Sequence, residues 1–428
     1  ASLQVNGAFL SWPVVKINSM WYGVPDYNAY LTDNTMYLFQ HLLLTSLLFL
    51  APLAPNSTSM PIEPAAERTN LYLPMLQGKR VAVFANQTSR VKEAHLIDVL
   101  LQHHIKVIKI FSPEHGFRGD HDERINDSVD TKTQLPIISL YGKKLRPSSL
   151  DLKDIDVILF DIQDVGVRFY TYISSLENLM EAATDNNKPL IILDRPNPNG
   201  FYVDGPVLDL NYRSFTGMQA IPVVYGMTIG EYAKMLVGEE WLHVTPKSKS
   251  KTLQLTIVPN KYYTHHSLYE PPVKPSPNLP NIQSIYLYPS IGLMEGTAMS
   301  VGRGTDKPFQ QFGHPAIATN YTFIPKANSY APYPVYKDKV CHGWDLSGSK
   351  EAVFKKINNQ LQIKYLIAAY NAFPDKKHFF KGFSSVAGNQ QLEEQIKAGV
   401  DEKTIRKSWE PQLSAFKKIR KKYLIYSE

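Results

Sequence analysis

A glutamate and a histidine stand side by side at the end of an apolar run, in Phe111-Ser-Pro-Glu-His-Gly-Phe117. The residues before them, Lys106–Phe111, have the pattern of a buried β-strand. In open α/β folds, ligands bind at the carboxyl ends of parallel strands. Glu114 and His115 therefore occupy a position at which site residues are expected.

The same arrangement of an apolar run followed by polar residues occurs three more times. Val81–Ala85 precedes Asn86-Gln-Thr88, Val157–Phe160 precedes Asp161-Ile-Gln-Asp164, and Leu190–Leu193 precedes Asp194-Arg-Pro-Asn197. Any one of these loops could be a helix cap or a turn. Four such loops together predict one sheet edge that carries carboxylates, amides and a guanidinium.

Helical patterns separate these strands. Glu93–His104 and Tyr172–Ala183 have apolar residues at helical spacing, and Thr228-Ile-Gly-Glu231 has the form of a capping box at a helix start. Strands that alternate with helices predict an α/β fold with a parallel sheet.

The length of 428 residues predicts two domains, because single cores rarely grow this large. We expect the first domain at residues 71–241 and a smaller α+β auxiliary domain at 242–428. In the latter, Leu253–Val258 has a strand pattern, and Lys350–Leu361 and Glu402–Leu424 have helical patterns.

Residues 1–70 are predicted to be an N-terminal extension. Residues 36–57 contain a short apolar core followed by small and turn-forming residues, which resembles a signal peptide, and Pro61–Thr69 is expected to be a linker. The segment lacks a basic start and 35 residues precede it, so a buried helix is the alternative. We expect a secreted or periplasmic protein without a stable membrane span in its mature form.

Composition is that of a soluble globular protein, with 43% hydrophobic and 20% charged residues. Much of the net charge of +7 lies in Lys403–Lys422, which a helix with a solvated basic face explains, and no nucleic-acid motif accompanies it. We therefore expect no nucleic-acid partner. The single cysteine, Cys341, excludes an intramolecular disulfide and a Cys-rich zinc site.

Several familiar site motifs are missing from the sequence. It has no Gly-x-Gly-x-x-Gly after the first strand, no nucleotide-binding P-loop, no His-Glu-x-x-His and no Gly-x-Ser-x-Gly. Ser347-Gly-Ser-Lys350 lacks the partner motifs of penicillin-binding enzymes, and the pairs His103–His104 and His265–His266 are predicted to be solvated. We expect neither a metal nor an organic cofactor.

A site rich in carboxylates, amides and aromatic rings suits a sugar. Glycoside cleavage needs a proton donor for the leaving oxygen and stabilisation of a positively charged centre, and carboxyl groups perform both tasks. Glu114 is the leading candidate for the donor. Asp161 and Asp164 are candidate partners, although Asp161 could instead cap its turn, and a pair with Arg168 is the favoured explanation for Asp164.

Five blocks of the chain together resemble the DUF1343 family, whose characterised members are exo-β-N-acetylmuramidases that release N-acetylmuramic acid from non-reducing ends of peptidoglycan fragments. The blocks are Phe111–Phe117, Asp161–Tyr172, Asp194–Gly200, Pro275–Pro280, and Glu295–Thr297 with Ser300–Asp306. The resemblance covers about residue 71 to the C-terminus. It implies a Rossmann-like domain, a smaller auxiliary domain, an active site in the cleft between them, and Glu114 as the catalytic glutamate.

The resemblance also gives the remaining polar residues a role. N-acetylmuramic acid carries a lactyl carboxylate, which a guanidinium binds with two parallel hydrogen bonds. Arg303, between Gly302 and Gly304, is the first candidate for this contact and Arg168 the second, while an ion pair of Arg303 with Asp306 or Glu295 is the alternative.

Further contacts to the sugar are expected from Asn86, Tyr170, Asn197 and Glu295, with turn formation as the alternative for the two asparagines. Tyr172 is expected to pack in the core. The sequence thus predicts an exo-β-N-acetylmuramidase that acts on murein fragments. A non-catalytic muropeptide-binding protein is the alternative, and an esterase or amidase acting on the same material is a third.

Overall fold

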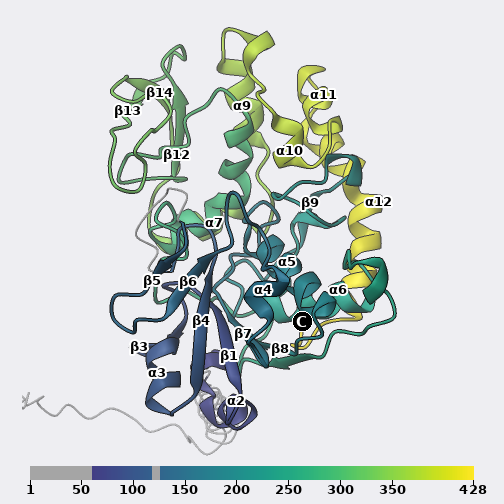
Figure 1. Cartoon of the computed structure of the whole chain (residues 1–428). Helices are drawn as coiled ribbons and strands as arrows, with labels where there is room; N and C mark the ends of the chain where they lie inside the picture. The colour runs from purple at the N-terminus through teal and green to yellow at the C-terminus, as the bar shows by residue number, and fades with distance from the viewer. Residues whose placement is uncertain (1–59, 118–125) are drawn as a thin grey trace, which may run out of the picture. The chain divides into compact units, whose positions relative to one another are not determined.

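The computed structural model describes residues 60–117 and 126–428. Its central feature there is a seven-stranded sheet with the order β11-β8-β7-β1-β4-β6-β5 (Figure 1). The strands are β1 (Arg80–Ala85), β4 (Lys106–Ser112), β5 (Ser128–Val129), β6 (Pro136–Ser139), β7 (Val157–Asp161), β8 (Leu190–Leu193) and β11 (Leu255–Val258). All neighbours are parallel except β5 and β6, which are antiparallel. The α/β fold class predicted from the sequence is confirmed.

Apolar side chains cover both faces of this sheet. Val81 and Val83 point into one core together with α2 and α3, whereas Ala82 and Phe84 point into a second core together with α5 and α6. This alternation follows from the two-residue period of a strand. The four helices are α2 (Thr69–Leu76), α3 (Leu96–Gln102), α5 (Tyr172–Asp185) and α6 (Ile229–Gly238).

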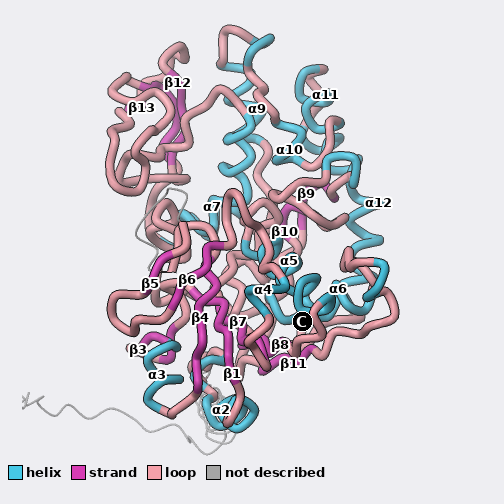
Figure 2. The backbone as a smooth tube through the Cα atoms, in the orientation of Figure 1, coloured by secondary structure: helices cyan, strands magenta, loops and turns pink. Residues whose placement is uncertain are grey.

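The C-terminal part of the chain adds helices and a small antiparallel sheet, which Figure 2 shows apart from the parallel strands. The sheet has the order β12-β14-β13, formed by Gln311–His314, Cys341–Asp345 and Tyr321–Phe323. The helices are α7 (Ile282–Ile291), α8 (Lys350–Ile357), α9 (Lys364–Ala372), α10 (Phe383–Ala387), α11 (Gln391–Lys397) and α12 (Glu402–Lys421). Residues of α7, α9, α10 and α12 belong to the same core as α5 and α6.

Shorter elements complete the described residues. They are the hairpins β2 (Arg90–Val91) with β3 (Ala94–His95) and β9 (Asp204–Val207) with β10 (Pro222–Val224), the helix α4 (Ser149–Leu152), and the 3-10 turns η1 (Ala65–Glu67), η2 (Leu210–Tyr212), η3 (Pro246–Ser248), η4 (Gly292–Gly296) and η5 (Lys376–His378).

The four predicted strands are present as β1, β4, β7 and β8, and the capping box of Thr228 with Glu231 starts α6. Two regions pack elsewhere than the predicted division into extension, first domain and auxiliary domain would place them. β11, which lies beyond residue 241, pairs with β8 in the main sheet. The expected linker packs against the fold, since Ala65 and Ala66 are fully buried and the backbone of Glu63 pairs with Lys261.

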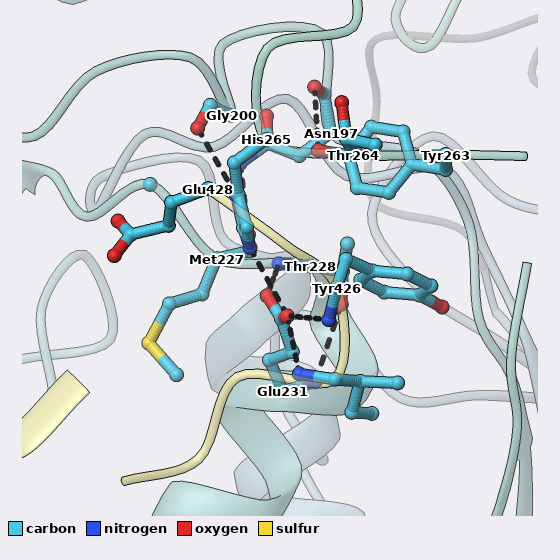
Figure 3. A network of polar contacts seen from close by, with 12 residues as sticks. Asn197, Gly200, Met227, Thr228, Glu231, Tyr263, Thr264, His265, Tyr426 and Glu428 are labelled. Carbon is cyan, nitrogen blue, oxygen red and sulfur yellow. Dashed lines mark hydrogen bonds and ion pairs between the residues drawn. The ribbon is translucent and has the colours of Figure 1, made fainter. Parts of the chain in front are cut away.

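A buried polar network holds the C-terminal tail against α6 (Figure 3). One oxygen of the Glu231 carboxylate accepts hydrogen bonds from the backbone N–H groups of Ile425 and Tyr426, at 2.8 and 3.2 Å, and lies 3.1 Å from His265 Nε2. The Tyr426 hydroxyl donates to Asp194 at 2.6 Å. The prediction of a solvated His265 is therefore wrong, because this side chain fills the core beside a buried carboxylate.

The signal-like segment at residues 36–57 lies outside the described residues. Within the described ranges, no helix has both the length and the apolar composition that a membrane crossing requires.

Candidate active site

A tight turn after β4 presents the Glu-His pair. The Gly116 N–H donates to the Pro113 carbonyl at 3.1 Å, and His115, third in this four-residue turn, has a φ of 67°. Left-handed backbone costs a residue with a Cβ about 1 to 2 kcal/mol, so glycine or asparagine would fit the position better. The His115 imidazole lies 3.3 Å from the Ser276 hydroxyl through Nε2.

Both oxygens of the Glu114 carboxylate accept hydrogen bonds. The Tyr141 hydroxyl donates to Oε1 at 2.6 Å and the Thr171 hydroxyl donates to Oε2 at 2.7 Å. Tyr141 follows β6, and Thr171 precedes α5 in the segment after β7. The parallel strands β4, β6 and β7 thus bring these groups to one edge of the sheet, as the topology requires.

Glu114 lines a cavity of about 230 Å³, whose walls come from residues 114–216 and 276–309. Its walls are Glu114, His115, Tyr141, Phe169, Tyr170, Thr171, Phe215, Thr216, Ser276, Leu279, Tyr288, Glu295, Arg303 and Phe309. Aromatic rings that surround a few charged groups form a surface suited to a sugar, whose apolar faces pack on rings while its hydroxyls bind polar groups.

A larger hollow of about 830 Å³ lies between α8 and α12. Lysine and arginine side chains line much of it. Of its two acidic residues, Glu402 is half-buried and Glu410 is exposed. It contains none of the residues at the strand ends. We therefore take the smaller cavity as the candidate active site.

The opposite wall of the cavity holds an ion pair. Arg303 Nε lies 2.9 Å from Glu295 Oε1, with each side chain about one third exposed, and the guanidinium stacks 5.1 Å from the centre of the Phe309 ring. Gly302 and Gly304 both have a φ of 80°, and a Cβ on Gly304 would come within 2.5 Å of the Lys326 carbonyl. The two glycines thus allow the backbone to pack closely on both sides of Arg303.

Charged groups from both walls of the cavity act on Tyr288. Burial raises the pKa of its phenol well above the usual value, and the charges of Glu295 and, to a smaller extent, Glu114 raise this pKa further. Tyr288 therefore stays neutral and protonated in a field to which both carboxylates contribute.

Four of the predicted site residues do not line this cavity. Asp161 is fully buried, and Arg195 holds both of its carboxylate oxygens at 2.5 and 2.8 Å, so its carboxylate is used inside the fold. Arg168 is also fully buried and donates to four backbone carbonyls between 2.7 and 3.0 Å.

The two asparagines form turns. The side-chain oxygen Oδ1 of Asn86 accepts from the Thr88 N–H at 2.9 Å, and the side-chain amide nitrogen donates to the Tyr172 hydroxyl at 3.0 Å. The Asn197 side chain makes the equivalent turn with Asn199 and donates to the Met227 carbonyl at 2.8 Å. Turn formation, the alternative considered for both residues, therefore accounts for them, and neither lines the cavity.

Asp164 also differs from its favoured explanation. Its carboxylate accepts from the Tyr225 hydroxyl and, at 2.6 Å, from the Gly166 N–H, and not from Arg168. Burial raises the pKa of this carboxyl to about 6. Tyr170 lines the cavity with its ring while its hydroxyl donates to the Pro275 carbonyl at 2.7 Å, and Tyr172 is buried as expected.

The cavity is also lined by residues that are not among the predicted site residues, including Tyr141, Thr171, Phe215, Ser276, Tyr288 and Phe309. Of these, Thr171 and Ser276 lie inside the blocks that resemble the family, so the sequence offered a reason to predict them. Among the described residues, no group of three or more His, Cys, Asp and Glu side chains is arranged to hold a metal ion.

Comparison with known proteins identifies the family. Residues 81–283 match the family model described as exo-β-N-acetylmuramidase NamZ, N-terminal, and residues 286–426 match the corresponding C-terminal model. The chain belongs to the NamZ family. It is accordingly a glycoside hydrolase.

Relatives of known sequence or structure support this membership. The chain is 36% identical over 378 residues to the peptidoglycan β-N-acetylmuramidase NamZ of Bacillus subtilis (strain 168), covering 83% of this chain and 89% of that protein. Two crystal structures of DUF1343 family proteins from Bacteroides fragilis NCTC 9343 are also similar. One has a TM-score of 0.79 and 44% identity, with 86% of this chain and all of that chain covered, and the other has a TM-score of 0.67 and 29% identity, with 86% and 99% covered.

Proposed function

We propose that this NamZ family member is an exo-acting β-N-acetylmuramidase that releases N-acetylmuramic acid from the non-reducing ends of peptidoglycan fragments, with Glu114 as the general acid. The observation that carries the proposal is the hydrogen-bonded Glu114 carboxyl group in a small aromatic cavity opposite Arg303. In this reaction Glu114 gives its proton to the leaving glycosidic oxygen.

The polar groups of the cavity divide the remaining tasks. Arg303 is the group for the lactyl carboxylate, because a guanidinium binds carboxylates through paired hydrogen bonds. Glu295 takes the place of Asp161 as the second carboxylate, since Glu114 and Glu295 are the acidic residues that line the cavity among the described residues, whereas Asp161 is buried against Arg195. A volume of about 230 Å³ suits the end of a saccharide chain better than a polymer passing through.

The test compares an aryl β-N-acetylmuramide with the matching aryl β-N-acetylglucosaminide. We expect selective release from the muramide. Glu114→Gln should reduce turnover of a natural disaccharide by about 10² to 10⁴, and should reduce aryl release less, because a good leaving group needs less protonation. Glu410→Gln on the exposed side of α12 is the matched control and should retain activity.

Near-normal turnover of the natural disaccharide by Glu114→Gln would refute the acid assignment. An inactive wild-type protein that still binds muropeptides would instead favour the non-catalytic alternative.

A further inference from the structure

Thr171 occupies the N-cap position of α5, but its hydroxyl makes no capping hydrogen bond to the helix. Threonine is favoured at this position because its oxygen normally accepts from the backbone N–H two or three residues later. Here the hydroxyl donates to Glu114 instead, at 2.7 Å. The hydroxyl that would normally cap the helix therefore contacts the candidate acid instead.

Tyr141 makes the second contact from a different part of the sheet. Its hydroxyl lies 2.6 Å from Glu114 Oε1, the short distance typical of a hydrogen bond from a hydroxyl to a carboxylate. Its ring lies 6.3 Å from the ring of Phe215, which also lines the cavity. Tyr141 is therefore fixed by the cavity wall as well as by Glu114.

We propose that Tyr141 and Thr171 are positioning residues that hold both oxygens of Glu114 and stabilise its carboxylate form. The inference rests on the proposed role of Glu114. Each carboxylate oxygen has two lone-pair sites, so a hydroxyl can donate to one while the catalytic proton occupies the other. Once the proton has moved to the glycosidic oxygen, both hydroxyls donate to the full negative charge that remains.

This arrangement assists the reaction at the point where it is most needed. Hydrogen bonds to the charged form favour that form, so they are strongest as Glu114 loses its proton in the transition state. The N-terminus of α5, which Thr171 precedes, favours negative charge in the same direction.

Other ionisable groups also face Glu114 or act on its surroundings, and the test must leave them intact. They come from the turn after β4, from the segment that enters α5, from α7 and from the wall formed by η4 and the loop after it, and are His115, Tyr170, Tyr172, Tyr288, Glu295 and Arg303.

The experiment measures kcat/KM against pH for Tyr141→Phe, Thr171→Val and Thr171→Ser. Loss of one donor favours the protonated form of Glu114, so the high-pH limb of the profile should move to higher pH by about one unit in Tyr141→Phe and in Thr171→Val. Thr171→Ser keeps the hydroxyl and should restore the wild-type limb. Tyr333→Phe, at a position 88% exposed, is the matched control.

The outcomes separate this inference from the proposed function. A low-pH limb that moves upward would support the positioning role but show that Glu114 acts as a base or nucleophile. Folded variants with lower kcat/KM and unmoved limbs would overturn the positioning role. A wild-type enzyme that prefers the glucosaminide would refute the muramidase assignment, and the limbs can then be measured on that substrate.

Discussion

Arg168→Ala should lower the free energy of unfolding by about 3 to 5 kcal/mol and reduce activity on every substrate to the same extent. Arg168 is the largest fully buried side chain among the described residues. Its Nη1 donates to the carbonyls of Pro206 and Ile221, and its Nη2 donates to those of Val386 and Ala387. It was a candidate for the lactyl contact in the sequence, and the structure instead gives it a place inside the fold.

The magnitude follows from these four hydrogen bonds. A hydrogen bond to a charged group contributes about 1.5 to 3 kcal/mol, so four contribute about 6 to 12 kcal/mol. These contributions are not additive within one network, and removing one partner of a buried charged interaction costs about 3 to 5 kcal/mol. Val386 and Ala387 end α10, whose terminal carbonyls lack helical partners and favour a positive charge. About 3 to 5 kcal/mol of net loss remains.

Urea unfolding of three variants provides the assay. Arg168→Lys keeps the charge but cannot reproduce a planar fork that reaches two pairs of carbonyls, so an intermediate loss is expected. Arg303→Ala removes a pair about one third exposed and should cost no more than about 1 kcal/mol. An Arg168→Ala protein with a wild-type midpoint and a selective loss on the muramide would refute this reasoning and return Arg168 to substrate recognition.

Three further outcomes are expected. Arg303→Ala should reduce activity on the muramide roughly ten- to a hundred-fold more than any residual reaction on the glucosaminide, because a charged hydrogen bond contributes about 1.5 to 3 kcal/mol; equal losses in kcat/KM would limit Arg303 to support of the fold. Thermal unfolding should occur at a higher temperature at pH 5.5 than at pH 8, and the reverse order would contradict the burial argument. Buried carboxyls whose folded pKa is raised stabilise the fold below their unfolded pKa and lose this contribution as pH rises through the folded value, here about 6 for Asp164, 7 for Glu177 and 7 for Asp194. We also propose export, so the mature protein should begin after Ala51 when its N-terminus is sequenced, and a product that retains residues 42–50 would point to an anchor or a buried helix.

The sequence predicts the strands well because buried parallel strands are continuous apolar runs. It also places Glu114 and Arg303, which both line the cavity. The prediction that residues at the other strand ends face the site is less successful. Asn86 and Asp161 follow β1 and end β7, but the structure turns their side chains into the fold. A strand end fixes the edge at which a residue lies, whereas local hydrogen bonds decide where its side chain points.

Tyr141 illustrates what the sequence conceals. It follows β6, a four-residue strand that begins with proline and carries little periodic signal. Its pairing with β4 across a long connection places its hydroxyl beside Glu114, and nothing local in the sequence encodes that contact. Thr171 is a similar case, since a threonine before a helix is normally explained by capping alone.

The candidate site depends on contacts that neither half of the chain can make by itself. Glu114 stands on the first sheet, while Glu295 lies in η4, and α10 packs directly against η4, because a Cβ on Gly296 would come within 2.7 Å of the Phe383 backbone. Arg168 holds the end of α10 to the hairpin beside the first sheet. The proposed reaction needs proton donation and recognition of the sugar at a fixed separation, so a small shift between these elements would cost activity without any change in the cavity residues. The buried Arg168, which does not line the cavity, therefore helps to set the distance between Glu114 and the groups opposite it.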